Sequence, residues 1–215
     1  MIFERLDFYF DDTPRAGPLN MAIDEALALA TTQPALRVYR WKNAAVSFGY
    51  FGRHRKVAAR WPGHELVRRW TGGGEVPHGE DFTYTLAVPR AHEFSRIAVR
   101  ESYRTLHTAL AALLPGAELA ATDAADAPAC FARPVVADIL VGGKKAAGAA
   151  QRRGTFGLLH QGSVQGIPHL DNLAELLAST LAHEVAHTTL SPALLDSAEK
   201  IAAQKYATDA WLQRR

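Results

Sequence analysis

The first stretch that could do chemistry combines two arginines with a run of glycines. It reads Arg68-Arg69-Trp70-Thr71-Gly72-Gly73-Gly74, and His78 follows it. Glycine loses the most conformational freedom on folding, so three in a row are costly at an ordinary turn. Their exposed N–H groups can bind a carboxylate or phosphate, and arginines add positive charge. The stretch therefore predicts an anion-binding loop, with a flexible hairpin tip as the alternative.

A second stretch places a lysine among glycines and small residues. Residues 138–151 read DILVGGKKAAGAAQ, and no bulky neighbour surrounds Lys145. Such a lysine, on an exposed strand flanked by turns, suits a cation directed at an acyl carbonyl or phosphate oxygen. The segment is not a P-loop, because Asp138 and Lys145 occupy the places that require Gly and Ser or Thr.

A third pattern belongs to a different enzyme class. His183, Glu184 and His187 fit HExxH, which on a helix places two imidazoles on one face for zinc, with the glutamate as base. Glu199 could supply a third ligand. Three fixed positions arise easily by chance in a chain with nine histidines. We therefore interpret them as residues of a surface helix, expect no metal, and keep a zinc protease as a distant alternative.

Composition indicates a folded protein with no obvious polyanionic or membrane partner. Apolar residues make up 48% of the 215, and the formal net charge is +2. The basic residues form short pairs, too short for a nucleic-acid stripe. Cys130 is the only cysteine, so neither an intramolecular disulfide nor a Cys-based zinc cluster is possible. Without a signal-peptide pattern or a run of about 18 apolar residues, the sequence predicts a cytoplasmic protein.

Periodicity predicts an α+β fold with a central mixed, mainly antiparallel sheet flanked by helices in a single domain, residues 1–215. Residues 18–31, with Asn20 as a possible cap, and 95–114 are expected to be helices. Residues 36–41 and 45–51 read as a hairpin, and 117–129 as a surface loop. The remaining expected strands are 65–70, 82–88, 137–141, 145–151 and 157–164, and the remaining expected helices are 173–189 and 194–211.

Several of these stretches, in this order, resemble the lipoate-protein ligase A and octanoyltransferase family of the biotin/lipoate protein ligase superfamily. Residues 20–25 are similar to its first-helix signature, 68–74 to its RRxTGGG loop, and 138–151 to its lysine pattern. The resemblance covers nearly the whole chain. It implies a fold like those of biotin ligases and class II aminoacyl-tRNA synthetases, and we expect no separate C-terminal accessory domain.

The resemblance also implies a set of site residues. Lys145 corresponds to the lysine that contacts the reacting carbonyl. The residues implied to bind the acyl group and its carboxyl are Arg69, Thr71, Gly72, Gly73, Gly74, His78, Asp138, Gly148 and Gln151. One departure follows His78, where Gly79-Glu80-Asp81 replaces the family's Asp and Gly-Asn pair.

Cys130 bears on the mechanism. Cys130-Phe131 resembles the position of the nucleophile in octanoyltransferases, although a lone cysteine can also be a small buried apolar residue. A thiolate would take an octanoyl group from acyl-carrier protein as a thioester and pass it to a lysine. Nearby cations such as Lys145 would lower the pKa of the thiol.

The resulting prediction is protein lipoylation. The chain is expected to transfer an octanoyl or lipoyl group to a lysine of the lipoyl carrier domain of 2-oxoacid dehydrogenases or of the glycine cleavage H protein, with no tightly bound cofactor. The alternatives are an ATP-dependent lipoate-protein ligase, which would use ATP and Mg and form lipoyl-adenylate, and a module that binds carriers without chemistry.

Overall fold

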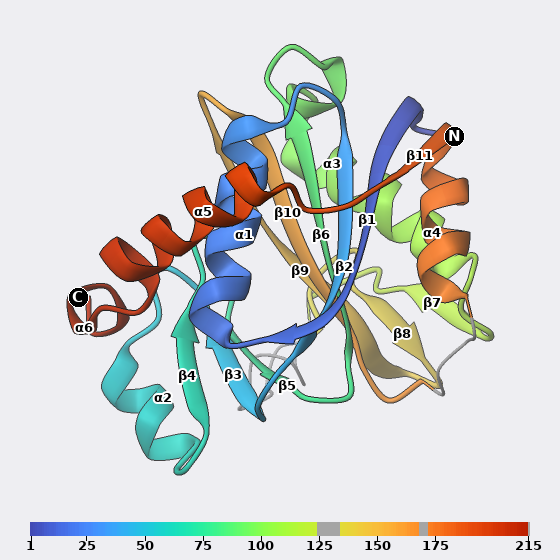
Figure 1. Ribbon diagram of the computed structural model, residues 1–215. Coiled ribbons are helices and arrows are strands. Elements are labelled where there is room, and N and C mark those ends of the chain that lie inside the picture. The colour runs from blue at the N-terminus through green and yellow to red at the C-terminus, as the bar shows by residue number, and fades with distance from the viewer. Residues whose placement is uncertain (124–133, 168–171, 215) are drawn as a thin grey trace.

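The computed structural model describes residues 1–123, 134–167 and 172–214, and their core is an eight-stranded mixed sheet (Figure 1). Strand β1 is parallel to both of its neighbours, whereas the other neighbouring strands are antiparallel. The α+β prediction is confirmed. Across the sheet the strands are β11 (Ala182–Thr188), β1 (Phe3–Arg15), β2 (Ala35–Trp41), β6 (Phe82–Pro89), β10 (Gly157–Val164), β9 (Lys144–Gly154), β8 (Ile139–Val141) and β7 (Ala117–Leu119).

A second sheet of three strands lies next to the arginine–glycine loop, which we define as residues 69–74. Its central strand β3 (Ala45–Phe48) runs parallel to β4 (Glu65–Arg68) and antiparallel to β5 (Glu75–His78). The predicted hairpin of residues 36–41 and 45–51 is therefore wrong. Strand β2 is already paired on one edge with β1 and on the other with β6, so no edge remains for β3.

Helices cover both faces of the large sheet. Figure 1 shows α1 (Gly17–Ala30) and α5 (Pro192–Ile201) on one face and α3 (Val99–Ala111) and α4 (Leu173–Leu181) on the other. Two shorter helices are α2 (His54–Arg60) and α6 (Asp209–Leu212), with a 3₁₀ turn at Glu93–Ser95 and a π-helical turn at Ala202–Tyr206. No helix among the described residues is long and apolar enough to cross a membrane.

Helix α1 joins the parallel strands β1 and β2 and places polar groups inside the molecule. Asn20 lies within the helix rather than capping it. Its buried amide donates to the carbonyls of Arg15 and Arg40, so it ties the helix to the ends of both strands. The predicted cap is wrong because the helix already begins at Gly17.

The C-terminal third differs most from the expected pattern. The predicted helix 173–189 ends at Leu181, and residues 182–188 instead form the edge strand β11, parallel to β1. The predicted helix 194–211 is interrupted after Ile201 by the π-helical turn. Ala182 is buried and Val185 partly buried against the main core. Their spacing of three suited a helix equally well, which explains the wrong assignment.

Strand β11 also rules out the HExxH interpretation. Four residues of extended chain span about 13 Å, so His183 and His187 are not one helical turn apart. Glu184 lies 3.6 Å from Arg5, and His187 lies 3.5 Å from Glu175. Within residues 1–123, 134–167 and 172–214, no group of three or more His, Cys, Asp or Glu side chains could hold a metal ion.

Candidate active site

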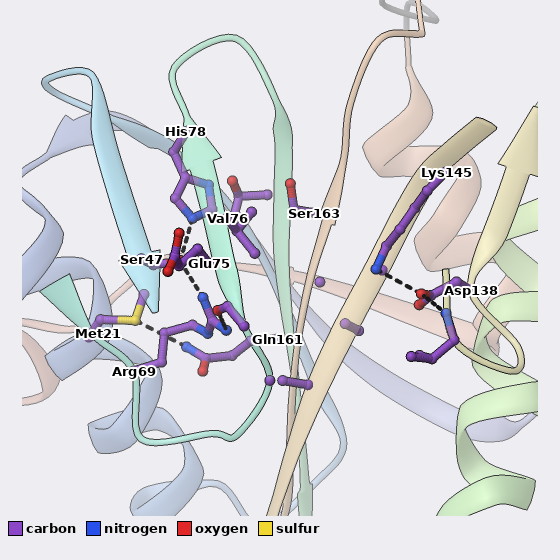
Figure 2. Close-up of a pocket in the computed structure, with 18 of the residues that line it drawn as sticks. Met21, Ser47, Arg69, Glu75, Val76, His78, Asp138, Lys145, Gln161 and Ser163 are labelled. Carbon is purple, nitrogen blue, oxygen red and sulfur yellow. Dashed lines mark hydrogen bonds and ion pairs between the residues drawn. The ribbon is translucent and has the colours of Figure 1, made fainter. Parts of the chain in front are cut away.

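A cavity of about 310 Å³ lies between the three-stranded sheet and strands β9 and β10 (Figure 2). One wall, which we call the loop side, presents Ser47, Arg69, Gly73, Gly74 and His78. The opposite wall, the lysine side, presents Asp138, Lys145 and Gly148. Apolar lining is contributed by side chains of α1, β2, β5 and β9, among them Met21, Tyr39, Trp41, Val76 and Ala150.

The loop of residues 69–74 is held against β3 by backbone contacts. The Gly49 N–H donates to the Gly74 carbonyl, and the Tyr50 N–H donates to the Thr71 carbonyl. A Cβ on Gly49 would lie 2.0 Å from the Gly73 carbonyl oxygen, so only glycine permits this approach. Gly73 itself has φ of +80°, which glycine adopts without strain. The glycines therefore give the loop one tight shape rather than flexibility.

Arg69 ties the loop from inside. Its Nη2 donates to the carbonyls of Gly72 and Gly74, at 3.1 and 2.8 Å, and its Nη1 donates to Ser47 Oγ at 2.6 Å. Arg69 thus bridges the loop and strand β3.

Arg68, the neighbouring arginine, points elsewhere. Its guanidinium donates to the backbone carbonyls of Tyr50, Gly52, Trp211, Leu212 and Arg214. The indole of Trp211 donates back to the Arg68 carbonyl at 3.0 Å. Arg68 therefore fastens residues 211–214 to the strand that precedes the loop and supplies no charge to the cavity.

Thr71 anchors the loop to the large sheet and α1. Its hydroxyl donates to Gln161 Oε1 at 2.8 Å, and Gln161 Nε2 donates to Asp24 at 2.7 Å. Asp24 forms an ion pair of 2.8 Å with the fully buried Arg37. These groups lose their water on burial, and the chain of partners compensates for that loss.

His78 lies in a second buried chain. Its Nε2 is 2.6 Å from Ser47 Oγ, its Nδ1 is 2.8 Å from Asp81, and its ring stacks on Trp41 at 4.0 Å. Asp81 also accepts from Thr83 and Ser163. Burial lowers the pKa of His78 although Asp81 opposes the shift, so the imidazole is neutral at pH 7. The pKa of the Asp81 carboxyl is also lowered, because His78 and the hydroxyl donors stabilise its charge against the effect of burial.

Lys145 supplies the cation of the lysine side. Its Nζ lies 2.7 Å from Asp138, and their side chains are only 9% and 1% exposed, so the predicted exposed position is wrong. An irregular register between β8 and β9 re-aims this part of β9. A Cβ on Gly148 would lie 2.6 Å from the Lys145 Cε, so the glycine makes room for the lysine.

The structure brings together seven of the predicted site residues around the cavity, namely Arg69, Gly73, Gly74, His78, Asp138, Lys145 and Gly148. Gly72 and Gln151 line an adjoining hollow of about 650 Å³ that shares Gly73 and Ala150 with the cavity. Thr71 is fully buried behind the loop, and Cys130 lies outside the described residues.

Sequence reasoning missed Ser47, Asp81 and the Asp24–Gln161 link. Ser47 and Gln161 lie inside stretches that the sequence predicts only as strands, residues 45–51 and 157–164. Asp81 belongs to the Gly79-Glu80-Asp81 departure after His78, and that departure from the family pattern was the one available signal. Their partners are up to 137 residues away in the chain.

The fold is that of lipoate-protein ligases. A crystal structure of lipoate-protein ligase A bound with ATP superposes with a TM-score of 0.78 at 20% identity, covering 99% of both chains. A bipartite lipoate protein ligase from Thermoplasma acidophilum, studied with its E2 lipoyl domain, gives 0.72 at 19% identity, covering 99% of this chain and 97% of the other.

The model of the lipoyl protein ligase A/B catalytic domain matches residues 17–199, and the chain belongs to that family. Octanoyltransferase LipM from Oceanobacillus iheyensis is 32% identical over 185 residues, which are 78% of this chain and 67% of the relative. LipM from Moorella thermoacetica is 38% identical over 171 residues, 71% and 63% of the two chains. The expected family and enzyme class are confirmed, and the chain spans about two thirds of the length of these relatives.

Proposed function

We propose that this protein transfers an octanoyl group from an acyl-carrier protein to a lysine of a lipoyl carrier domain, through a thioester on Cys130. The observation that carries the proposal is the cavity in which the arginine–glycine loop faces Lys145. Relatives named octanoyltransferase LipM support octanoyl as the group transferred. The fold neighbour studied with an E2 lipoyl domain supports that class of acceptor.

Groups on both sides of the cavity have a part in this chemistry. The apolar lining takes the octanoyl chain, and Lys145 places positive charge near the thioester carbonyl, where negative charge develops during attack. The backbone N–H groups of Gly73 and Gly74, which line the cavity, are proposed as further donors to that oxygen. Asp138 fixes the ammonium in place.

The transfer then proceeds in two balanced steps. The Cys130 thiolate attacks the carbonyl of the octanoyl-carrier thioester, and the carrier leaves as its thiolate. The acceptor lysine, as the free amine, attacks the enzyme thioester, loses a proton to water, and expels the Cys130 thiolate. No nucleotide is consumed.

Intact-mass spectrometry tests this route. The protein incubated with octanoyl-carrier protein is expected to gain one octanoyl group, and Cys130→Ala is expected to lose both the adduct and transfer to a lipoyl domain. An alanine variant that remains active and requires ATP and Mg would contradict the thioester route and support a ligase acting through an acyl-adenylate. A wild-type protein that transfers no acyl group, either from octanoyl-carrier protein or from the free acid with ATP and Mg, would contradict both the thioester route and the ligase route.

A further inference from the structure

Four buried side chains form a row of contacts from the residue before strand β6 to the arginine–glycine loop. In order they are Asp81, His78, Ser47 and Arg69, with contacts of 2.8, 2.6 and 2.6 Å. Figure 2 shows His78, Ser47 and Arg69 following one another along the loop side of the cavity. The proposed chemistry uses none of these contacts directly.

The partners determine the direction of every hydrogen bond in this chain. Arg69 can only donate, and an ionised Asp81 can only accept. The neutral imidazole of His78 therefore carries its proton on Nδ1, which donates to Asp81, and its Nε2 accepts from the Ser47 hydroxyl. Ser47 Oγ is then left to accept from Arg69 Nη1. Each donor meets an acceptor only in this arrangement.

The chain ends on the loop. With Nη1 directed to Ser47, Nη2 of Arg69 is oriented toward the carbonyls of Gly72 and Gly74. Those two contacts fix the direction of both carbonyls. The orientation of a planar guanidinium is fixed when both nitrogens are held, so the shape of the loop depends on Ser47 accepting rather than donating.

We propose that Asp81, His78 and Ser47 are positioning residues, which hold Arg69 and through it the loop in the shape that binds the acyl group. This inference rests on the proposed function for the identity of the acyl group. The imidazole exchanges no proton with substrate in this role. Its task is to present an acceptor to Ser47.

Protonation of His78 reverses that polarity. An imidazolium would carry a proton on Nε2 and donate to Ser47, whose own hydroxyl hydrogen would then need another acceptor. The charged groups facing His78 are Asp81, from the turn before β6, and Arg69, from the loop. Trp41 of β2 covers the ring and Ser47 of β3 meets Nε2, and neither is charged. The loop is therefore expected to lose its acyl-binding shape at acid pH.

Two neutral amides at position 78 separate positioning from proton transfer. In His78→Gln the amide reaches the place of Nε2 and can accept from Ser47, whereas in His78→Asn it reaches only the place of Nδ1 and Asp81. The glutamine variant is expected to keep kcat/KM within about tenfold of wild type, and the asparagine variant to lose about 10²-fold, because a small displacement of a binding group has effects of that size. Binding of octanoic acid, measured by calorimetry, should weaken in the asparagine variant only.

The pH profile gives an independent readout. The activity of His78→Gln relative to wild type should rise as the pH falls, because glutamine cannot take a proton. Equal losses in both variants would mean that the imidazole itself takes part in the chemistry, and equal retention would mean that the loop does not need the chain. Either result overturns the inference.

Two serines on the same chain supply a matched pair. Ser47→Ala removes the link between His78 and Arg69, and it should weaken octanoic acid binding as strongly as His78→Asn. Ser163→Ala removes a hydroxyl that donates to Asp81 at 2.6 Å and accepts from Gln165 at 3.4 Å. It leaves the link between His78 and Arg69 in place, so it should have less than about a threefold effect. Equal effects would contradict the role of Ser47. A wild-type protein that binds octanoic acid with this variant pattern but transfers no octanoyl group would contradict the proposed function alone.

Discussion

The two sides of the cavity are built on different principles. On the loop side, Arg69 and Thr71 each begin a chain of buried hydrogen bonds that continues into a neighbouring sheet or helix. On the lysine side, the described residues show the ion pair between Lys145 and Asp138, which lies beside a glycine that leaves room for the lysine. Under the proposed function, the loop side would be a preorganised binding wall, and Lys145 would be a single group placed to act on the carbonyl.

Removing the cation should have the largest effect. Lys145→Ala is expected to lower octanoyl transfer about 10²- to 10³-fold, the size seen when one group that stabilises the developing charge is removed. Asp138 would then be buried without its cation, which should destabilise the fold by up to about 3 kcal/mol. Activity and thermal unfolding are measured together.

A double variant separates these two effects. Adding Asp138→Asn to Lys145→Ala removes the uncompensated carboxylate, so stability should recover while activity stays low. Near-normal turnover in any folded Lys145→Ala protein would remove the lysine from the mechanism.

Filling the space beside the lysine should have an intermediate effect. In Gly148→Ala the new methyl group would lie 2.8 Å from Nζ of Lys145 and 3.1 Å from Asp138, so the lysine must move. Transfer is expected to fall about 10- to 100-fold. Gly79→Ala, which adds the same methyl group to open space, is the control, and equal activity in the two variants would show that the lysine tolerates displacement.

On the loop side, Thr71→Val should affect stability before chemistry. The substitution keeps the shape and removes the donor to Gln161, leaving a buried oxygen unsatisfied at a cost of about 1–3 kcal/mol. Chemical denaturation measures the loss. Thr108→Val on the exposed face of α3 should change the free energy of unfolding by less than about 0.5 kcal/mol, and a similar change in both variants would mean that the Thr71 contact adds nothing.

The histidines predict a pH dependence of stability. Burial lowers the pKa of His78, His107 and His160, so in the folded protein they bind protons only at a lower pH than in the unfolded chain. Below about pH 6.5 the unfolded state binds more protons than the folded state. As the pH decreases, the free energy of unfolding therefore falls by up to about 1.4 kcal/mol per pH unit for each histidine. Above that pH this dependence disappears.

One substitution isolates a single histidine. His107→Asn keeps a donor for the Ala137 carbonyl. It should reduce the slope of the free energy of unfolding against pH by the contribution of one histidine. Thr108→Val, which removes no titratable group from the exposed face of α3, should leave the slope unchanged. Unfolding curves between about pH 5 and pH 8 measure both, and an unaltered slope in His107→Asn would contradict the assignment.

Sequence patterns located most of the elements that carry the site. The strands on both sides of the 142–143 turn and the strand that became β10 were expected from the sequence, and both turn glycines have positive φ. The pattern failed where spacing was ambiguous, as at Ala182 and Val185. It also failed at β3, because nothing local shows that both edges of β2 are occupied by strands from elsewhere in the chain.

The sequence also indicated part of the candidate site. Glycine runs, paired arginines and a lysine among small residues are rare enough to indicate ligand contact, and seven of the predicted residues share one cavity. The residue pattern alone assigned charge to both adjacent arginines, and only the family resemblance singled out Arg69, because the strand's alternation decides which of the two faces the cavity. Ser47 and Asp81 have common side chains whose meaning comes only from His78 between them.

The contacts of Arg68 have a consequence for how the protein is made. Its guanidinium lies in the strand just before the loop, yet three of its carbonyl partners are synthesised 143 to 146 residues later. While only the first half of these residues has been synthesised, the Nε and Nη2 groups of Arg68 lack the carbonyl acceptors that they have in the folded protein. The entropic cost of closing the loop between Arg68 and residues 211–214 grows only slowly with the length of that loop. The contact can nevertheless form only after residues 211–214 have been translated. The loop side of the cavity is therefore completed only after residues 211–214 have been synthesised, although its own sequence appears early.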